Sequence, residues 1–107
     1  MHNGAYFGTI IIMSMLSHVV RNVFLFSGRV QGVGFRHTTV SMARSYKIAG
    51  TVCNLPDGRV ELILEGSPDQ IEKLVTEIES RFAGFIDSIT RQTAPVEGLP
   101  PPVRIIW

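Results

Sequence analysis

Hydrophobic and charged side chains alternate regularly along residues 59–66. The hydrophobic positions are Val60, Leu62 and Leu64, and the charged positions are Arg59, Glu61 and Glu65. A period of two is typical of a strand with one buried and one exposed face. Residues 48–55 alternate as well, and Leu55-Pro56-Asp57-Gly58 has the proline and glycine of a type I turn. The two segments therefore predict an antiparallel hairpin whose glutamates point outward.

A helical period governs two other segments. Ser67 is a predicted N-cap, Pro68 occupies the first helical position and Gln70 completes a capping box. The hydrophobic positions that follow share one helix face: Ile71, Leu74, Val75, Ile78 and Phe82. Residues 35–46 show a weaker version of this pattern, with core positions at Phe35, Met42, Ala43 and Tyr46. Two helices are therefore predicted, the second of them ending near Gly84.

Three further segments have the β-branched and aromatic content of strands. They are residues 19–27, 85–93 and 103–107. The order strand, helix, strand, strand, helix, strand is the split βαβ arrangement of ferredoxin-like α+β domains. We therefore expect a βαββαβ sandwich over residues 19–107, with two helices on one face of an antiparallel sheet and a short extra C-terminal strand.

Residues 1–18 form a predicted N-terminal extension, and the sequence does not define whether it is ordered or what it does. Its apolar part, residues 5–16, has no basic residue before it and is shorter than the roughly 20 residues of a membrane span. We therefore expect neither a signal peptide nor a membrane anchor. Met13 and Met15 are alternative starts, and a loosely packed arm that promotes association is another reading of the same residues.

The length, charge and cysteine content of the chain limit the classes of protein to which it can belong. The chain has 107 residues, enough for one core, and its ten basic and nine acidic side chains leave a formal charge of +1. RNA-recognition domains share the predicted element order, but the outward Glu61 and Glu65 and the lack of a basic run argue against nucleic acid. Cys53 is the single cysteine, which excludes an internal disulfide and fits a cytoplasmic protein.

A glycine-rich stretch joins the first strand to the first helix. The sequence Ser27-Gly28-Arg29-Val30-Gln31-Gly32-Val33-Gly34-Phe35-Arg36 places three glycines and an arginine at a helix start. Glycines let backbone N–H groups converge on a ligand, and a helix N-terminus favours an anion. The candidate phosphate-binding amides are those of Gln31, Gly32, Val33, Gly34, Phe35 and Arg36. The Arg36 guanidinium is the candidate clamp; an ordinary tight turn followed by a solvated arginine is the alternative.

Asn54 ends the second predicted strand, and the topology brings that end close to the glycine loop. Its carboxamide could bind a ligand or water there, or could start the following turn through its own hydrogen bonds. His37 follows Arg36 on the helix and is expected to face solvent. Cys53 points to the opposite face from Asn54, so it is not expected to act as a nucleophile.

The two motifs together resemble the acylphosphatase family. Residues 28–36 look like its signature, and Ala49-Gly50-Thr51-Val52-Cys53-Asn54-Leu55-Pro56-Asp57-Gly58 looks like its second motif. The resemblance covers residues 19–107 and implies hydrolysis of small acyl phosphates to a carboxylate and inorganic phosphate without a metal, cofactor or phosphoenzyme. By similarity, Arg36 and Asn54 are the catalytic residues: Arg36 binds the phosphoryl group and Asn54 orients the attacking water. It further implies a monomer that binds phosphate or sulfate as product-like ligands.

The residue types present agree with that chemistry. An acyl phosphate expels a carboxylate, a weak base, so no general acid is needed, and the phosphoryl group can take the proton of the water. Positioning and charge stabilisation then remain as the tasks of the protein. A Walker-type Lys-Ser/Thr pair is absent from the sequence, so the substrate must supply its own good leaving group.

Two residues of the second motif depart from the family pattern. Thr51 and Cys53 stand where bulkier residues are common, which bears on stability rather than on the chemistry. The chain could also be an acylphosphatase-like domain of a larger carbamoyl-phosphate-handling maturation protein, although it lacks a cysteine-rich zinc segment. The physiological acyl phosphate is not encoded in any motif.

Overall fold

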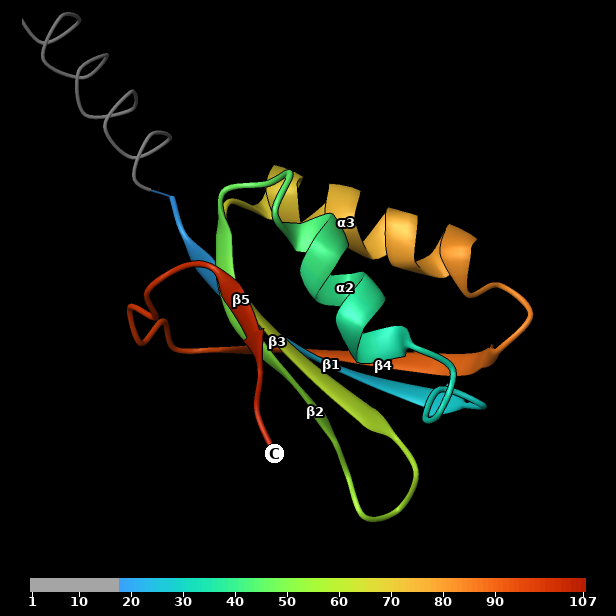
Figure 1. The fold of residues 1–107 in the computed structure, drawn as a ribbon. Helices are drawn as coiled ribbons and strands as arrows, with labels where there is room; N and C mark the ends of the chain where they lie inside the picture. Colours follow the sequence, from blue (N-terminus) through green and yellow to red (C-terminus); the bar gives the residue numbers. More distant parts are fainter. Residues whose placement is uncertain (1–17) are drawn as a thin grey trace, which may run out of the picture.

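Two helices and five strands make up the computed structural model, which describes residues 18–107. The predicted extension therefore lies outside the described residues, except for His18. The elements are β1 (Val20–Gly28), α2 (Phe35–Ala43), β2 (Ile48–Asn54), β3 (Val60–Gly66), α3 (Pro68–Arg81), β4 (Ile86–Ala94) and β5 (Val103–Ile105). Both helices cover the same face of one twisted sheet (Figure 1). The predicted α+β sandwich is confirmed.

The strand order in the sheet is β4-β1-β3-β2-β5. Four strands pair antiparallel, as predicted, and Asn54 lies opposite Val60 at the turn end of the β2–β3 hairpin. The short β5 differs, because it runs parallel to β2 with Ile105 opposite Val52. The sheet is therefore mixed rather than wholly antiparallel, since the linker after β4 carries the chain across to the far edge of the sheet.

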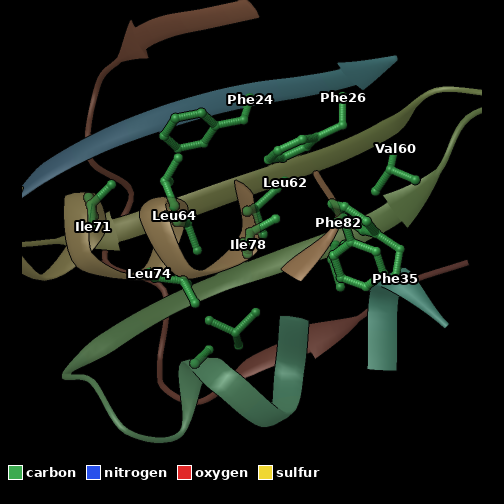
Figure 2. Close-up of a cluster of buried hydrophobic side chains, with 14 of the residues drawn as sticks. Phe24, Phe26, Phe35, Val60, Leu62, Leu64, Ile71, Leu74, Ile78 and Phe82 are labelled. Atoms are coloured by element: carbon green, nitrogen blue, oxygen red, sulfur yellow. The ribbon is translucent and has the colours of Figure 1, made fainter. Parts of the chain in front are cut away.

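The core lies between the sheet and the two helices. Phe24, Leu62 and Leu64 of the sheet face Ile71, Leu74 and Ile78 of α3 (Figure 2). Phe35 of α2 joins the layers, with ring centroids 5.0 Å from Phe26 and 4.7 Å from Phe82. All five hydrophobic positions predicted for α3 are buried. Burial of such a stripe is the main source of helix stability in a domain of this size.

The first helix is shorter than predicted, and two of its four predicted core positions, Phe35 and Ala43, are fully buried. It ends at Ala43, and its buried residues are Phe35, Thr39 and Ala43, whereas Met42 and Tyr46 are only partly buried. These three positions are four residues apart, which is the spacing of one contact ridge of a helix. The polar Thr39 side chain hid this ridge from the hydrophobic pattern.

The Glu65 side chain is buried, contrary to the predicted outward position. It is 4% exposed and accepts hydrogen bonds from the backbone N–H groups of Glu97 at 2.6 Å, Gly98 at 3.0 Å and Leu99 at 2.8 Å. Arg21 donates to it at 2.9 Å. The linker between β4 and β5 thus folds onto a strand position that the alternation alone marked as solvent-facing. Because Glu65 is not on the surface, the argument against nucleic-acid binding now depends on Glu61 and on the lack of a basic run.

These contacts also set the ionisation of Glu65. Burial by itself raises the pKa of the carboxyl, but the N–H groups of Glu97 and Leu99 and the Arg21 guanidinium outweigh it, so that the pKa lies below its ordinary value. The charged form is therefore the one that holds the linker.

The predicted capping box of α3 is half formed. Ser67 Oγ accepts from the N–H of Gln70 at 3.3 Å, as expected of an N-cap. The Gln70 side chain instead accepts from the N–H of Lys47 at 3.2 Å. It ties the start of α3 to the chain before β2, a contact that a local motif cannot reveal.

In the part of the chain that the structure describes, no helix has the length and hydrophobicity to cross a membrane.

Glu65→Gln should lower the free energy of unfolding at neutral pH by about 2 kcal/mol, because it replaces charge-assisted hydrogen bonds and leaves Arg21 without its buried partner. The contribution of Glu65 is complete above the ordinary carboxyl pKa of about 4.3 and is lost as pH falls through the lower folded pKa. Urea unfolding as a function of pH tests this. Glu61→Gln on the same strand is the control, and equal effects of the two substitutions would contradict the assignment.

Candidate functional site

The loop between β1 and α2 has the backbone geometry of an anion site. Gly32 and Gly34 have φ angles of 76° and 81°, in the left-handed region that favours glycine. Gly34 is the N-cap of α2, no side chain caps this helix, and its first turn holds no acidic residue. The first N–H groups of α2 are therefore available to an anion, which the positive end of the helix dipole also favours.

Gly28 has a different task from the other two glycines. A Cβ atom at this position would lie 2.3 Å from the carbonyl oxygen of Phe85, whereas one at Gly32 would meet nothing within 4 Å. Arg29 N–H donates to the same carbonyl at 2.8 Å. Gly28 thus lets the end of β1 pack against the chain entering β4, while Gly32 shapes the loop.

The loop is fastened at both ends and in the middle. Val30 and Phe35 are 1% and 2% exposed and anchor it in the core. Between them, Gln31 Nε2 donates to the carbonyl oxygens of Leu55 at 2.8 Å and Arg59 at 3.0 Å. The Gln31 side chain therefore clips the loop to the two residues where the β2–β3 hairpin turns, and Figure 1 shows both segments at the same end of the molecule. Sequence reasoning used only the amide of Gln31, and no local signal indicates this contact.

Asn54 is the last residue of β2, directly before the clipped turn. Its Oδ1 atom is buried and has no hydrogen-bond partner among residues 18–107. The turn is closed by backbone bonds instead, from Leu55 N–H to Arg59 at 2.8 Å and from Gly58 N–H to Leu55 at 3.1 Å. These bonds account for the turn without the Asn54 side chain. A buried carbonyl oxygen is normally paired, and a water molecule is a common partner.

Arg36 lies in the first turn of α2, next to the last residue of the chain. Its guanidinium carbon is 5.0 Å from the ring centroid of Trp107. This is a cation–π contact, which occupies the face of the guanidinium and leaves the N–H edges in its plane available. No carboxylate among the described residues forms an ion pair with Arg36. Arg36 therefore retains charged donors for an anionic ligand.

Three other side chains near the loop could in principle bind a ligand or react, and the structure shows where each lies. Arg29 stacks on Phe85, with its guanidinium carbon 4.8 Å from the ring centroid. His37 is exposed, as predicted. Cys53 is half-buried and its thiol contacts the carbonyl oxygen of Asn54 at 3.3 Å. Over residues 18–107, no three His, Cys, Asp or Glu side chains are grouped in a way that would hold a metal ion.

A cavity of about 910 Å³ lies away from these residues. It is lined mostly by apolar groups of the α2–β2 connection and of the linker before β5, among them Ile48 at the first position of β2. Asn54 is at the other end of that strand, about 20 Å away at the usual rise per residue. The candidate site is therefore a cradle at the loop and not this cavity.

Comparison with known proteins agrees with the sequence motifs. A family model described as Acylphosphatase matches residues 22–98. A protein named acylphosphatase from a Synechococcus strain is 45% identical over 74 residues, which cover 68% of this chain and 79% of that protein. The crystal structure of acylphosphatase from Bacillus subtilis covers 82% of this chain and 99% of its own, with 29% identity and a TM-score of 0.73.

A larger protein contains a domain of the same shape. The structure of full-length HypF in a phosphate- and nucleotide-bound form covers 83% of this chain with 27% identity and a TM-score of 0.76. The match takes up only 12% of the HypF chain. The fold described here therefore also occurs as a part of a much longer protein.

Gln31→Ala should lower the free energy of unfolding by about 1 kcal/mol and speed hydrogen exchange of the loop amides, because two hydrogen bonds to the hairpin are lost. Urea unfolding and amide exchange measured by NMR would show both effects. Gln92→Ala, at an exposed position of β4, is the matched control. Unchanged loop exchange in Gln31→Ala would disprove the role of the clip.

Proposed function

The chain belongs to the acylphosphatase family, and we propose that the loop at residues 28–36 holds the phosphoryl group of a small acyl phosphate while Asn54 orients the attacking water. The observation that carries this proposal is the buried Oδ1 atom of Asn54, which lacks a partner among the described residues beside an anion cradle. An acceptor in that position can take a hydrogen bond from a water molecule and fix its direction.

Phosphate binding is assigned to backbone and arginine donors. The amides of Gln31, Gly32, Val33, Gly34, Phe35 and Arg36 would surround the phosphoryl oxygens. Left-handed Gly32 and Gly34 and the uncapped start of α2 support this assignment. The in-plane N–H groups of Arg36 would bind two further oxygen lone pairs and stabilise charge that builds up on them in the transition state. Inorganic phosphate or sulfate should occupy the same cradle.

Water is assigned to the side of the cradle formed by the hairpin. Gln31 holds the loop against Leu55 and Arg59, and thereby holds the phosphate donors close to Asn54. This rigid spacing matters because in-line attack requires the water to approach opposite the leaving group. Both partners of the reaction are then positioned by neighbouring parts of one chain, so we propose that a monomer is sufficient.

The bonds exchanged need little else from the protein. The water oxygen forms a bond to phosphorus, the bond between phosphorus and the acyl oxygen breaks, and its electron pair leaves with the carboxylate. One proton of the water passes to a phosphoryl oxygen and the other stays on the attacking oxygen, which gives a carboxylate and inorganic phosphate. Because the leaving group is a weak base, this sequence requires no general acid, no metal and no covalent enzyme intermediate.

Arg36→Ala and Asn54→Ala should each lower kcat for benzoyl phosphate by at least about 100-fold, since each removes a group worth on the order of 3 kcal/mol in the transition state. Steady-state assays test this, with circular dichroism to confirm that both variants fold. His37→Ala is the control, because His37 neighbours Arg36 on α2 but is exposed. Turnover near the wild-type rate in Asn54→Ala would exclude the proposed role for its carboxamide.

Hydrolysis should continue unchanged after exhaustive dialysis against a metal chelator, because the proposed steps use only protein donors and water. The measurement is the rate of benzoyl phosphate hydrolysis before and after dialysis, with Mg²⁺ added back as a control. Loss of activity that Mg²⁺ restores would show that a metal takes part and would overturn the metal-independent mechanism.

A further inference from the structure

Trp107 lies against the arginine that we assign to phosphate binding. We propose that its indole ring is a platform for the acyl group of the substrate, so that the site favours acyl phosphates with a planar aromatic acyl group. This inference rests on the function proposed above, because it takes the phosphoryl group to lie at Arg36. It adds a residue that sets substrate specificity.

The parallel pairing of β5 with β2 brings Trp107 to the site. Ile105 lies opposite Val52, and the N–H of Ile106 donates to the carbonyl oxygen of Val52 at 3.0 Å. Two residues beyond this pair, the segment that follows β5 reaches Trp107, and β2 reaches Asn54. Because parallel strands advance together, Trp107 arrives at the same end of the sheet as Asn54.

The surface of the indole is unusually open for an aromatic side chain. Trp107 is 90% exposed, although its ring contacts Arg36. A tryptophan side chain commonly buries a large area, so an indole left in solvent retains a surface suited to an apolar group. Phe85 beside Arg29 offers no such surface, because it packs against the hydrophobic core.

The chemistry of the substrate fits this arrangement. An acyl phosphate joins its acyl carbon to phosphorus through one oxygen atom, so the acyl group must lie within a few ångströms of the groups that bind the phosphate. The Arg36 guanidinium can stack on the indole through its face and bind phosphate through its edge. An aromatic acyl group extending from that phosphate would then lie along the indole.

The decisive experiment compares two substrates in three proteins. Trp107→Ala should lower kcat/KM for benzoyl phosphate roughly 2- to 10-fold more than kcat/KM for acetyl phosphate, which has no ring to stack. Trp107→Phe should keep most of the preference for benzoyl phosphate. If both substrates lose activity equally, Trp107 only supports Arg36 and the platform is disproved. If the wild-type protein hydrolyses neither substrate, the proposed function itself fails.

A binding measurement separates the platform from catalysis. Trp107 is the single tryptophan of the chain, so its fluorescence reports directly on the indole. A non-hydrolysable benzoylphosphonate should shift or quench this emission on saturation, whereas inorganic phosphate should have little effect. Equal responses to the two ligands, or no response to the aromatic one at saturating concentration, would contradict stacking on Trp107.

Discussion

Two hydrogen bonds from one side chain join the parts of the proposed site. Gln31 lies in the proposed anion-binding loop and donates to the carbonyl oxygens of Leu55 and Arg59 at the base of the hairpin turn. This clip is a direct link between the loop before α2 and the turn that follows Asn54. Catalysis by positioning depends on a fixed spacing between phosphate donors and water, because small displacements are costly in rate. In the proposed mechanism, the Gln31 side chain thus sets the spacing between phosphate and water, while its backbone amide is one of the proposed phosphate donors.

A second polar contact organises the opposite side of the sheet. Glu65 binds three successive N–H groups of the linker that leads to β5. By fixing that linker, it directs β5 alongside β2 and brings the last residues of the chain to Arg36. This buried carboxylate therefore holds the linker that leads to Trp107, the residue proposed to set substrate preference. Its charge is retained because Arg21 and the linker amides offset the cost of burial.

Local patterns predicted the elements of the fold well where one physical signal dominated. The stripe of α3, the alternation of β3 and the Pro-Asp-Gly turn each have a period or a turn chemistry that short-range sterics enforce. The pattern was misleading where a polar residue is buried. Thr39 sits on the buried ridge of α2, and Glu65 lies beneath the linker. Burial of a polar group depends on which distant segment covers it, and the local pattern of hydrophobic residues does not predict that segment.

The sequence by itself determined the helices, most strand boundaries, the glycine loop and the choice of Arg36 and Asn54 as candidates. These follow from spacing, backbone freedom and chemical type within a few residues. Only the tertiary structure decided what these groups face. The Gln31 clip spans 24 and 28 residues, and the Arg36–Trp107 contact spans almost the whole domain. Such contacts arise from strand register and crossover, which are settled by packing of the entire chain rather than by any local segment.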